Sequence, residues 1–192
     1  MMTSTIALKE WAVVVEALAE GQQLLLLRKG GIRDPKGAFQ LEHREFFLYP
    51  TWEHQSEAPE SKVRAEFRER YKGLFAQGCS LETIPLKIYA GVAYCAEVQD
   101  PKRLEGLRRY YIWTPEFIQE RMKYRPQAPT LAVVLRVYRL MKEIPHLFRP
   151  EYAGCKSWVP LGQALPIEGA VPIVDNQRFR KSLEEISGQL EN

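Results

Sequence analysis

The sequence predicts an α+β fold with a mixed, mainly antiparallel sheet, an N-terminal hairpin and three to four packing helices. Two observations support this prediction. Hairpin-like pairs of strands outnumber candidate crossover helices, so the sheet cannot be mostly parallel. Other stretches repeat apolar residues at helical spacing, as amphipathic helices do. The 192 residues, of which 45% are hydrophobic and 27% charged, are typical of one globular domain, residues 1–192.

The N-terminal part is predicted to form the hairpin. Apolar runs at residues 11–18 and 22–28 are separated by a short segment that contains Gly21, which is a hairpin signature. The second run contains four consecutive leucines (residues 24–27) and indicates a strand covered on both faces. Good helix formers in the first run leave a helix as its alternative. An extended segment is expected at residues 38–49, ending at Pro50.

Helices and strands alternate in the rest of the chain. Residues 60–76 form the clearest predicted helix, because their apolar side chains recur at helical spacing. Strands rich in β-branched residues are expected at residues 84–98, with a bulge at Gly91, and at 131–140 and 157–161. Helices preceded by a capping residue are expected to begin after Asp100, Thr114 and Asp175.

Cysteine content and hydropathy predict a cytoplasmic protein. Cys79, Cys95 and Cys155 are too few and too scattered for a disulfide framework or a zinc site with close-paired ligands. An odd number of thiols fits a reducing compartment. Residues 1–9 lack the apolar core of a secretory signal, and no apolar run approaches the roughly 20 residues that cross a bilayer. We therefore expect no membrane partner.

Positive charge is concentrated in the second half of the chain. Residues 101–150 contain eleven Lys or Arg and four Glu, a local charge of +7, so the remainder carries −4 in a chain of net charge +3. This asymmetry indicates a polyanionic partner, with solvated helix faces as the alternative. Neighbouring Tyr and Trp residues offer stacking surfaces for single-stranded bases. The predicted anion-binding residues of this stretch are Lys102, Arg103, Arg108, Arg109, Arg121, Lys123 and Arg125.

A second group of cations surrounds glycines after the buried strand. Residues 28–37 combine Arg28, Lys29 and Arg33 with three glycines. Glycine lets backbone amides approach an anion closely, and the cations favour it electrostatically. The segment lacks the phosphate-loop pattern and the dinucleotide fingerprint, so a solvated basic loop is the alternative. Arg28, Lys29 and Arg33 complete the predicted anion-binding set.

Residues 41–55 form the candidate pocket. They include His43 and His54, each directly preceded by a glutamate (Glu42 and Glu53), together with Arg44. Histidine can act as an acid or a base near neutral pH, and an adjacent carboxylate can orient it. Interleaved aromatic residues suit a lined pocket or a base-stacking surface. An aromatic core with exposed Glu and His side chains is the alternative.

No cofactor is expected from the sequence. Glu66 and Glu69 lie one helical turn apart and could hold a divalent metal with His54, but glutamates on a charged helix are more often solvated. Cys155 has a cation beside it and His146 as its only local base, and a buried thiol is the simpler interpretation.

Four segments of the chain resemble a known family. They are residues 7–11 (ALKEW), 25–32 (LLLRKGGI), 46–55 (FFLYPTWEHQ) and 154–159 (GCKSWV). They are similar to those of an uncharacterised bacterial, largely cyanobacterial family, domain-of-unknown-function family 1802. The likeness covers nearly the whole chain and implies no chemistry.

The order of elements also resembles that of Nudix hydrolases, more faintly. A strand ending at residues 24–30 (LLLLRKG), an amphipathic helix ending at Gly73 and a strand at residues 157–161 carry this likeness. That family cleaves nucleoside diphosphates linked to another group, with metal-binding glutamates on the helix. Residues 64–74 (RAEFRERYKGL) lack those glutamates in register, so the resemblance implies a scaffold without the chemistry.

Three hypotheses about function follow. The leading one is a protein that binds a phosphate-bearing ligand, above all nucleic acid, through the basic stretch with Arg28, Lys29 and Arg44. The second is a metal-dependent nucleotide or phosphoester hydrolase that uses the two Glu-His pairs. The third is an assembly or regulatory adaptor whose basic face binds an acidic protein partner. A common site requires the Glu-His pairs and the basic stretch to meet in one cleft.

Overall fold

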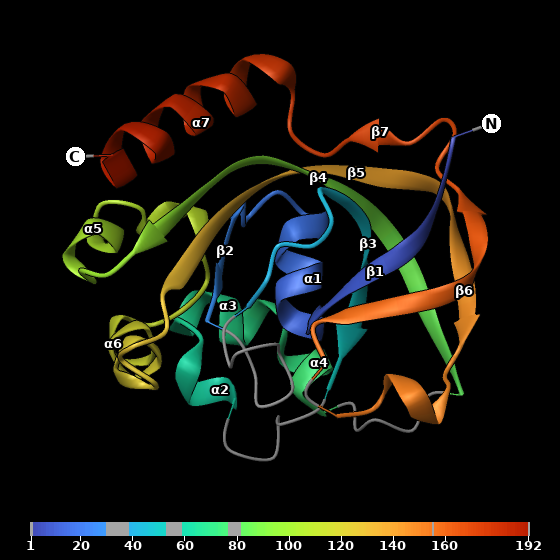
Figure 1. Ribbon diagram of the computed structural model, residues 1–192, viewed down its shortest axis with the longest axis horizontal. Helices are drawn as coiled ribbons and strands as arrows, with labels where there is room; N and C mark the ends of the chain where they lie inside the picture. The colour runs from blue at the N-terminus through green and yellow to red at the C-terminus, as the bar shows by residue number, and fades with distance from the viewer. Residues whose placement is uncertain (1, 30–38, 53–58, 77–81, 155, 192) are drawn as a thin grey trace.

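In the computed structural model, a strongly curved sheet wraps around one short helix, α1 (Ala12–Ala19), and further helices cover the outside and the open ends (Figure 1). The structure describes residues 2–29, 39–52, 59–76, 82–154 and 156–191. None of the helices in these ranges is both long and apolar enough to span a bilayer.

The sheet has seven strands in the order β2-β5-β4-β3-β1-β6, with β7 paired to β5. Among the pairs that the described residues form, β1 with β3 is parallel and the other five are antiparallel. The α+β class and the mixed, mainly antiparallel sheet are therefore confirmed. The strands are β1 (Thr3–Trp11), β2 (Leu25–Arg28), β3 (Glu45–Thr51), β4 (Thr83–Val98), β5 (Thr130–Leu147), β6 (Trp158–Pro166) and β7 (Val171–Pro172).

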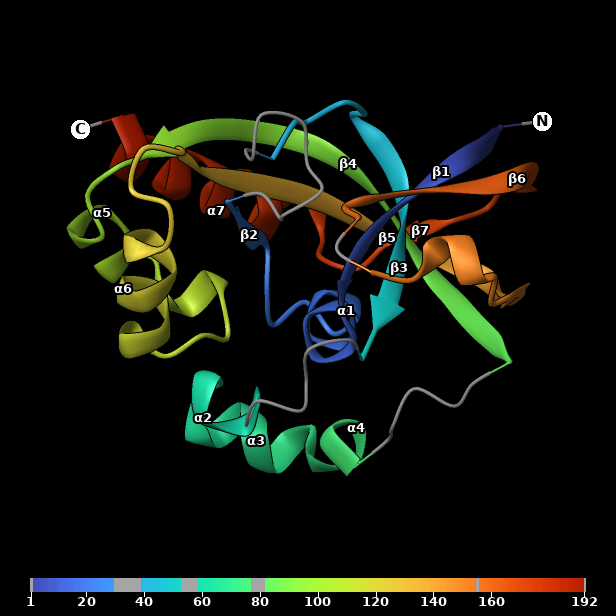
Figure 2. The same ribbon diagram turned by 60° about the horizontal axis from the view of Figure 1, so that its bottom comes forward.

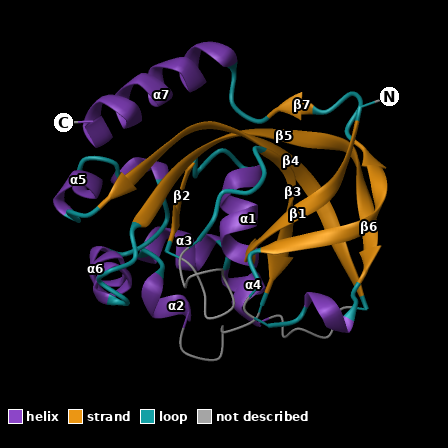
Figure 3. Ribbon diagram, viewed as in Figure 1, coloured by secondary structure: helices purple, strands orange, loops and turns teal. Residues whose placement is uncertain are grey.

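Seven α-helices occur in the described ranges, more than the three to four predicted, because four of them have only four to six residues. After α1 they are α2 (Pro59–Lys62), α3 (Ala65–Arg70), α4 (Lys72–Ala76), α5 (Lys102–Glu105), α6 (Pro115–Lys123) and α7 (Asn176–Glu191), with 3-10 turns η2 (Arg108–Tyr110) and η3 (Pro150–Tyr152). Helix α7 lies on the outside of β4 and β5, away from α1 (Figure 3).

The predicted N-terminal hairpin is wrong, because residues 12–19 form helix α1 instead of a strand. Every residue of α1 except Glu16 is buried. A helix that is enclosed on all sides shows no amphipathic period, and its three consecutive valines imitate a strand. The second run does form strand β2, but it pairs with β5, where Leu25 lies opposite Val134.

The single helix predicted at residues 60–76 is also wrong, since three short helices replace it. Val63 forms an isolated bridge with Trp113, and the Arg64 amide donates to the Ile112 carbonyl at 3.0 Å. These tertiary hydrogen bonds interrupt the helix between α2 and α3. The apolar stripe is nevertheless correct, because Val63, Phe67 and Tyr71 are buried. Figure 2 shows the three helices in a row beyond the end of α1.

Several other predicted elements are confirmed. Strand β4 matches its predicted range, although the register shift nearest to Gly91 lies between Val92 and Tyr94. Strand β5 includes the predicted residues 131–140 but continues to Leu147. The Thr114 side chain accepts from the Phe117 amide at the start of α6, and Asp175 accepts from the Arg178 amide at the start of α7. Strand β1 was not predicted.

Candidate anion-binding site

The curvature of the sheet brings its two end strands together, and Arg28 bridges them. Arg28 ends β2, whereas Glu10 belongs to β1 and Ser157 directly precedes β6, at the other end of the strand order. Arg28 donates from Nη1 to Glu10 Oε2 and from Nη2 to Ser157 Oγ, both at 2.9 Å. The Arg28 and Glu10 side chains are only 12% and 10% exposed. The line along which β2 faces β1 and β6 is called the seam below.

Two further cations, Lys29 and Arg121, lie close to Arg28, and these three residues are called the cationic cluster. Lys29 is buried, and its Nζ donates to the Met122 carbonyl at 2.5 Å. Arg121 is on α6; its Nε is enclosed and has no hydrogen-bond partner among the described residues. Within those residues, Glu10 is the only carboxylate that forms an ion pair with any member of the cluster.

Like charges in this partly buried cluster oppose one another. Burial, and then the charge of Arg121, lower the pKa of Lys29. Burial lowers the pKa of Arg121 as well, with a further contribution from Arg28 that Glu10 opposes. Both shifts have the direction expected when a cation loses water and gains a like-charged neighbour. An anion at the cluster would relieve this repulsion.

Lys9 holds the segment that carries Ser157. Its Nζ donates to the carbonyls of Tyr152 and Gly154 at 2.5 and 2.7 Å, and its amide donates to the Ser157 carbonyl at 2.8 Å. These bonds fix Ser157 against β1 and thereby place the hydroxyl that accepts from Arg28.

Aromatic rings flank the cluster on the side of Arg28. The Arg28 guanidinium lies 4.8 Å from the centroid of the Phe39 ring, and Phe39 stacks on Trp158 at 5.9 Å. The His43 ring meets the edge of Trp158 at 4.9 Å. His43, a residue of the predicted pocket, is thus connected to Arg28 through two rings. Trp158 and His43 both keep part of their surface exposed.

A second aromatic group lies on the side of Arg121. The Arg121 guanidinium is 5.9 Å from the centroid of Phe117, which packs against Trp113 at 4.8 Å and Trp11 at 6.2 Å. Trp11 directly follows Glu10, and its amide donates to Glu10 Oε1 at 2.9 Å. Trp11 is partly exposed. Arginine over aromatic rings and partly exposed tryptophans are features of surfaces that stack bases.

The other residues of the predicted pocket are less informative. Glu42 and Arg44 are exposed. Arg44 lies near Cys95 of β4, where burial raises the pKa of the thiol and the Arg44 charge lowers it. Glu53 and His54 lie outside the described residues, so the meeting of the two Glu-His pairs stays a prediction.

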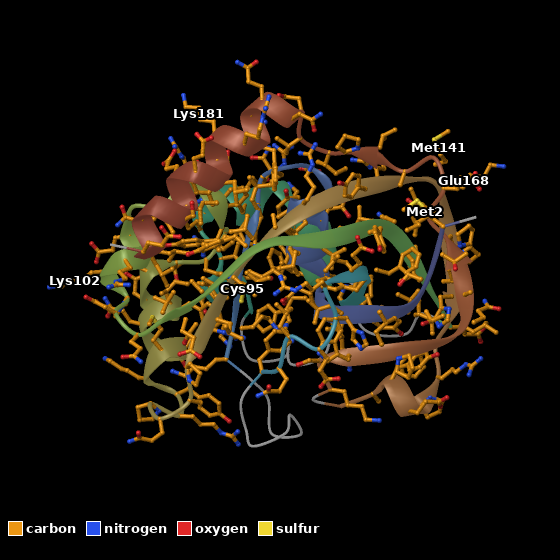
Figure 4. All side chains as sticks on the ribbon, turned by 45° about the horizontal axis from the view of Figure 1, so that its top comes forward. Met2, Cys95, Lys102, Met141, Glu168 and Lys181 are labelled. Carbon is orange, nitrogen blue, oxygen red and sulfur yellow. The ribbon has the colours of Figure 1, made fainter. Side chains whose placement is uncertain are left out.

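The predicted basic stretch divides between two parts of the molecule. Arg121 lies at the seam, whereas Arg103 donates to the Leu190 carbonyl at 2.9 Å and Arg109 forms an ion pair with Glu185, both on α7. Lys102 projects from α5, as Figure 4 shows. Arg108 and Lys123 are exposed, Arg125 lies over Tyr124, and Arg33 is outside the described residues.

A sizeable hollow lies elsewhere. A pocket of about 610 Å³ lies between α1, α4 and the ends of β3, β4 and β5. Its Lys87 is 3.3 Å from Glu16 and 3.9 Å from Glu143, and most of its other lining residues are apolar. It contains none of the predicted site residues, and its single cation is already paired, so it does not suit an anion.

The described residues provide no site for the metal ion or for the cysteine chemistry considered from the sequence. Among the described residues, no group of three or more His, Cys, Asp or Glu side chains could hold a metal ion; His54 and Cys155 lie outside them. His146 is buried against Tyr152, with Nε2 3.2 Å from the hydroxyl. Burial, and then the charge of Arg149, lower the pKa of His146.

The sequence predicted Arg28, Lys29 and Arg121 as anion-binding residues, which the structure places close together, but it did not single out Lys9, Glu10 and Ser157. The available signal was a break in pattern, because Lys9 and Glu10 interrupt an otherwise apolar segment, residues 6–15. Buried charged residues in such a position need partners.

Comparison with known proteins gives a family and a weak structural similarity. The model of a family described as "Domain of unknown function (DUF1802)" matches residues 7–185. No curated protein matches the chain. Crystal structures of ASCH from Zymomonas mobilis, including two of its mutants, have 9–12% identity and TM-scores of 0.40–0.44; the matches cover 93–94% of this chain and 93–96% of theirs. Similarity at this level supports no functional inference.

Proposed function

We propose that this chain, which belongs to the family described as a domain of unknown function (DUF1802), binds single-stranded nucleic acid. Membership of this family supplies no chemistry, so the proposal rests on the site. The predicted family resemblance is confirmed, whereas the Nudix resemblance stays a prediction. The observation that carries the proposal is the excess positive charge of the cationic cluster. Among the described ion pairs, Glu10 is the only carboxylate that offsets the charge of its three cations.

A phosphate group matches the needs of this cluster. Its oxygens can accept from the guanidinium groups of Arg28 and Arg121 while its charge offsets their mutual repulsion. Arginine is suited to this role because its planar group offers several donors in a fixed geometry. The position at a seam between strands also supports the proposal, because the main chain there is fixed by hydrogen bonds.

The aromatic groups extend the proposal from phosphate to nucleic acid. Trp158 and His43 lie on one side of the cluster and Trp11 on the other, and all three are partly exposed. Successive bases of a single strand can stack on such rings while the backbone follows the cations. An inorganic anion would use the cluster but not the rings.

The test is fluorescence anisotropy with labelled single-stranded RNA and DNA at low salt, followed by a salt titration. Binding should weaken steeply as salt increases. Arg121→Met should reduce affinity about tenfold and lower the salt slope by about one ion, since it removes one phosphate contact.

Lys181→Met is the matched control, because Lys181 projects from α7 far from the seam (Figure 4). It should bind like the unmodified protein. Absence of binding at low salt, or equal affinities for the Arg121 and Lys181 variants, would overturn the proposal. A stoichiometric protein partner that resists nuclease would support the adaptor hypothesis instead.

A further inference from the structure

A hollow of about 370 Å³ adjoins the cationic cluster at Lys29. Its other walls are residues 97–99 at the end of β4, Met122 on α6 and residues 126–129 before β5. Its volume is within the range of small-molecule sites. Lys29 lines the hollow and also belongs to the cluster. A nucleotide whose phosphate lies at the cluster can therefore place its base in the hollow.

The loop that forms one wall has a fixed and unusual backbone. Arg125 has φ of 49°, in the left-handed region that residues other than glycine rarely occupy. The Ala128 amide donates to the Arg125 carbonyl at 2.9 Å and closes a turn. Pro126 of this turn and Pro129 directly after it line the hollow, together with Met122. The apolar proline rings and the polarisable thioether are suitable surfaces for the faces of a base.

The polar side chains of the hollow can form hydrogen bonds with the edge of a base. Glu97, Gln99 and Gln127 line it, and all three are exposed. Among the described residues, Glu97 forms neither a side-chain hydrogen bond nor an ion pair. An ionised carboxylate only accepts hydrogen bonds, and it accepts two in parallel from a planar pair of donors.

Guanine is the base whose edge fits such a carboxylate. Its N1–H and N2–H groups point in the same direction and can each donate to one oxygen. Adenine and cytosine offer one amino group beside a ring nitrogen acceptor, and uracil offers one N–H between two carbonyl groups. We propose, resting on the proposed function, that this hollow is a base-recognition subsite in which Glu97 selects guanine.

The experiment measures the affinity of two labelled RNAs, each about ten nucleotides long so that one strand covers the site. One contains adenine only, and the other has a single central guanine. The guanine-containing strand should bind about tenfold more tightly, the effect expected of one bidentate base contact. Glu97→Gln should abolish this preference without weakening the binding of the adenine strand, because its amide group places a donor opposite a guanine donor.

Glu168→Gln removes the same charge at a distant position (Figure 4) and should retain the preference. Two results overturn the inference alone: equal affinities of the unmodified protein for both strands, or a preference that persists in Glu97→Gln. If neither strand binds the unmodified protein at low salt, the proposed function itself fails.

Discussion

Arg121 is the residue at which binding and stability are in conflict. It lies near two other cations, its Nε has no acceptor among the described residues, and its pKa is lowered by burial and by Arg28. A partly buried cation without a carboxylate partner is unfavourable for folding. Its presence is understandable if an anion occupies the cluster in the functional state.

This conflict predicts the effect of Arg121→Met on the protein without ligand. Methionine keeps an unbranched stem that can pack on Phe117 but removes the charge, so the free energy of unfolding should rise by about 1 kcal/mol. Urea unfolding at neutral pH, compared with Lys181→Met, measures the change. If Arg121→Met proves less stable than the unmodified protein, Arg121 has a structural role and the argument for an anion-binding site is lost.

The same residues show what a sequence can reveal about a site. Arg28 and Lys29 were predicted because they stand beside glycines, and Arg121 because it belongs to a stretch with excess positive charge. Glu10 lies 18 positions before Arg28, and Ser157 lies 129 positions after it. Contacts over such separations depend on the curvature of the sheet, which no local pattern encodes.

Among the helices, α6 determines the position of the cluster. It carries Arg121 and also Met122, whose carbonyl accepts from Lys29. The helix begins with Thr114, whose hydroxyl accepts from the Phe117 amide at 3.2 Å, and with proline in its first turn. Both features favour helix initiation at this residue.

Thr114→Ala should therefore destabilise the protein by about 1 kcal/mol, the usual cost of losing a capping side chain. Thr114→Ser is the matched control, because serine supplies the same acceptor. Urea unfolding of both variants measures the difference. Equal stability of the alanine and serine variants would show that the hydroxyl contributes nothing to α6.

Helices and strands differ in how far sequence reasoning could predict them. Helix α7 and strands β4 and β5 were predicted because one face of the helix and the branched residues of the strands leave clear patterns. The residues of helix α1 predict a strand instead, because the helix is buried on all sides and rich in valine. The break between α2 and α3 results from the bridge between Val63 and Trp113, which are 50 positions apart.

For the whole molecule, the seam connects the two ends of the sheet. Arg28 bonds to both Glu10 of β1 and Ser157 before β6, and its Nη1 also lies 3.3 Å from the Lys9 carbonyl. One side chain thus couples β2 to β1 and β6, strands with which β2 does not pair through its backbone. If this coupling closes the sheet, its loss should loosen both ends together.

A double-mutant cycle with Arg28→Met and Ser157→Ala tests this closure. Arg28→Met should cost about 3 kcal/mol because it leaves the Glu10 carboxylate buried without its cation. Ser157→Ala should cost about 1 kcal/mol, and the double variant should be less destabilised than the sum, because the two residues share one hydrogen bond. Hydrogen exchange should accelerate in β2 and in β6 in the Arg28 variant.

Breaking an exposed ion pair provides the comparison for this experiment. Lys72 and Glu69 are 2.7 Å apart, but both side chains are largely exposed. Lys72→Met should therefore leave stability and exchange in β2 and β6 unchanged, because solvent screens such pairs. Exchange that accelerates in β2 while β6 stays protected in Arg28→Met would mean that the two ends of the sheet are held independently. In that case β2 and α6 alone would fix the geometry of the cationic cluster, and the neighbouring β1 and β6 would not contribute to it.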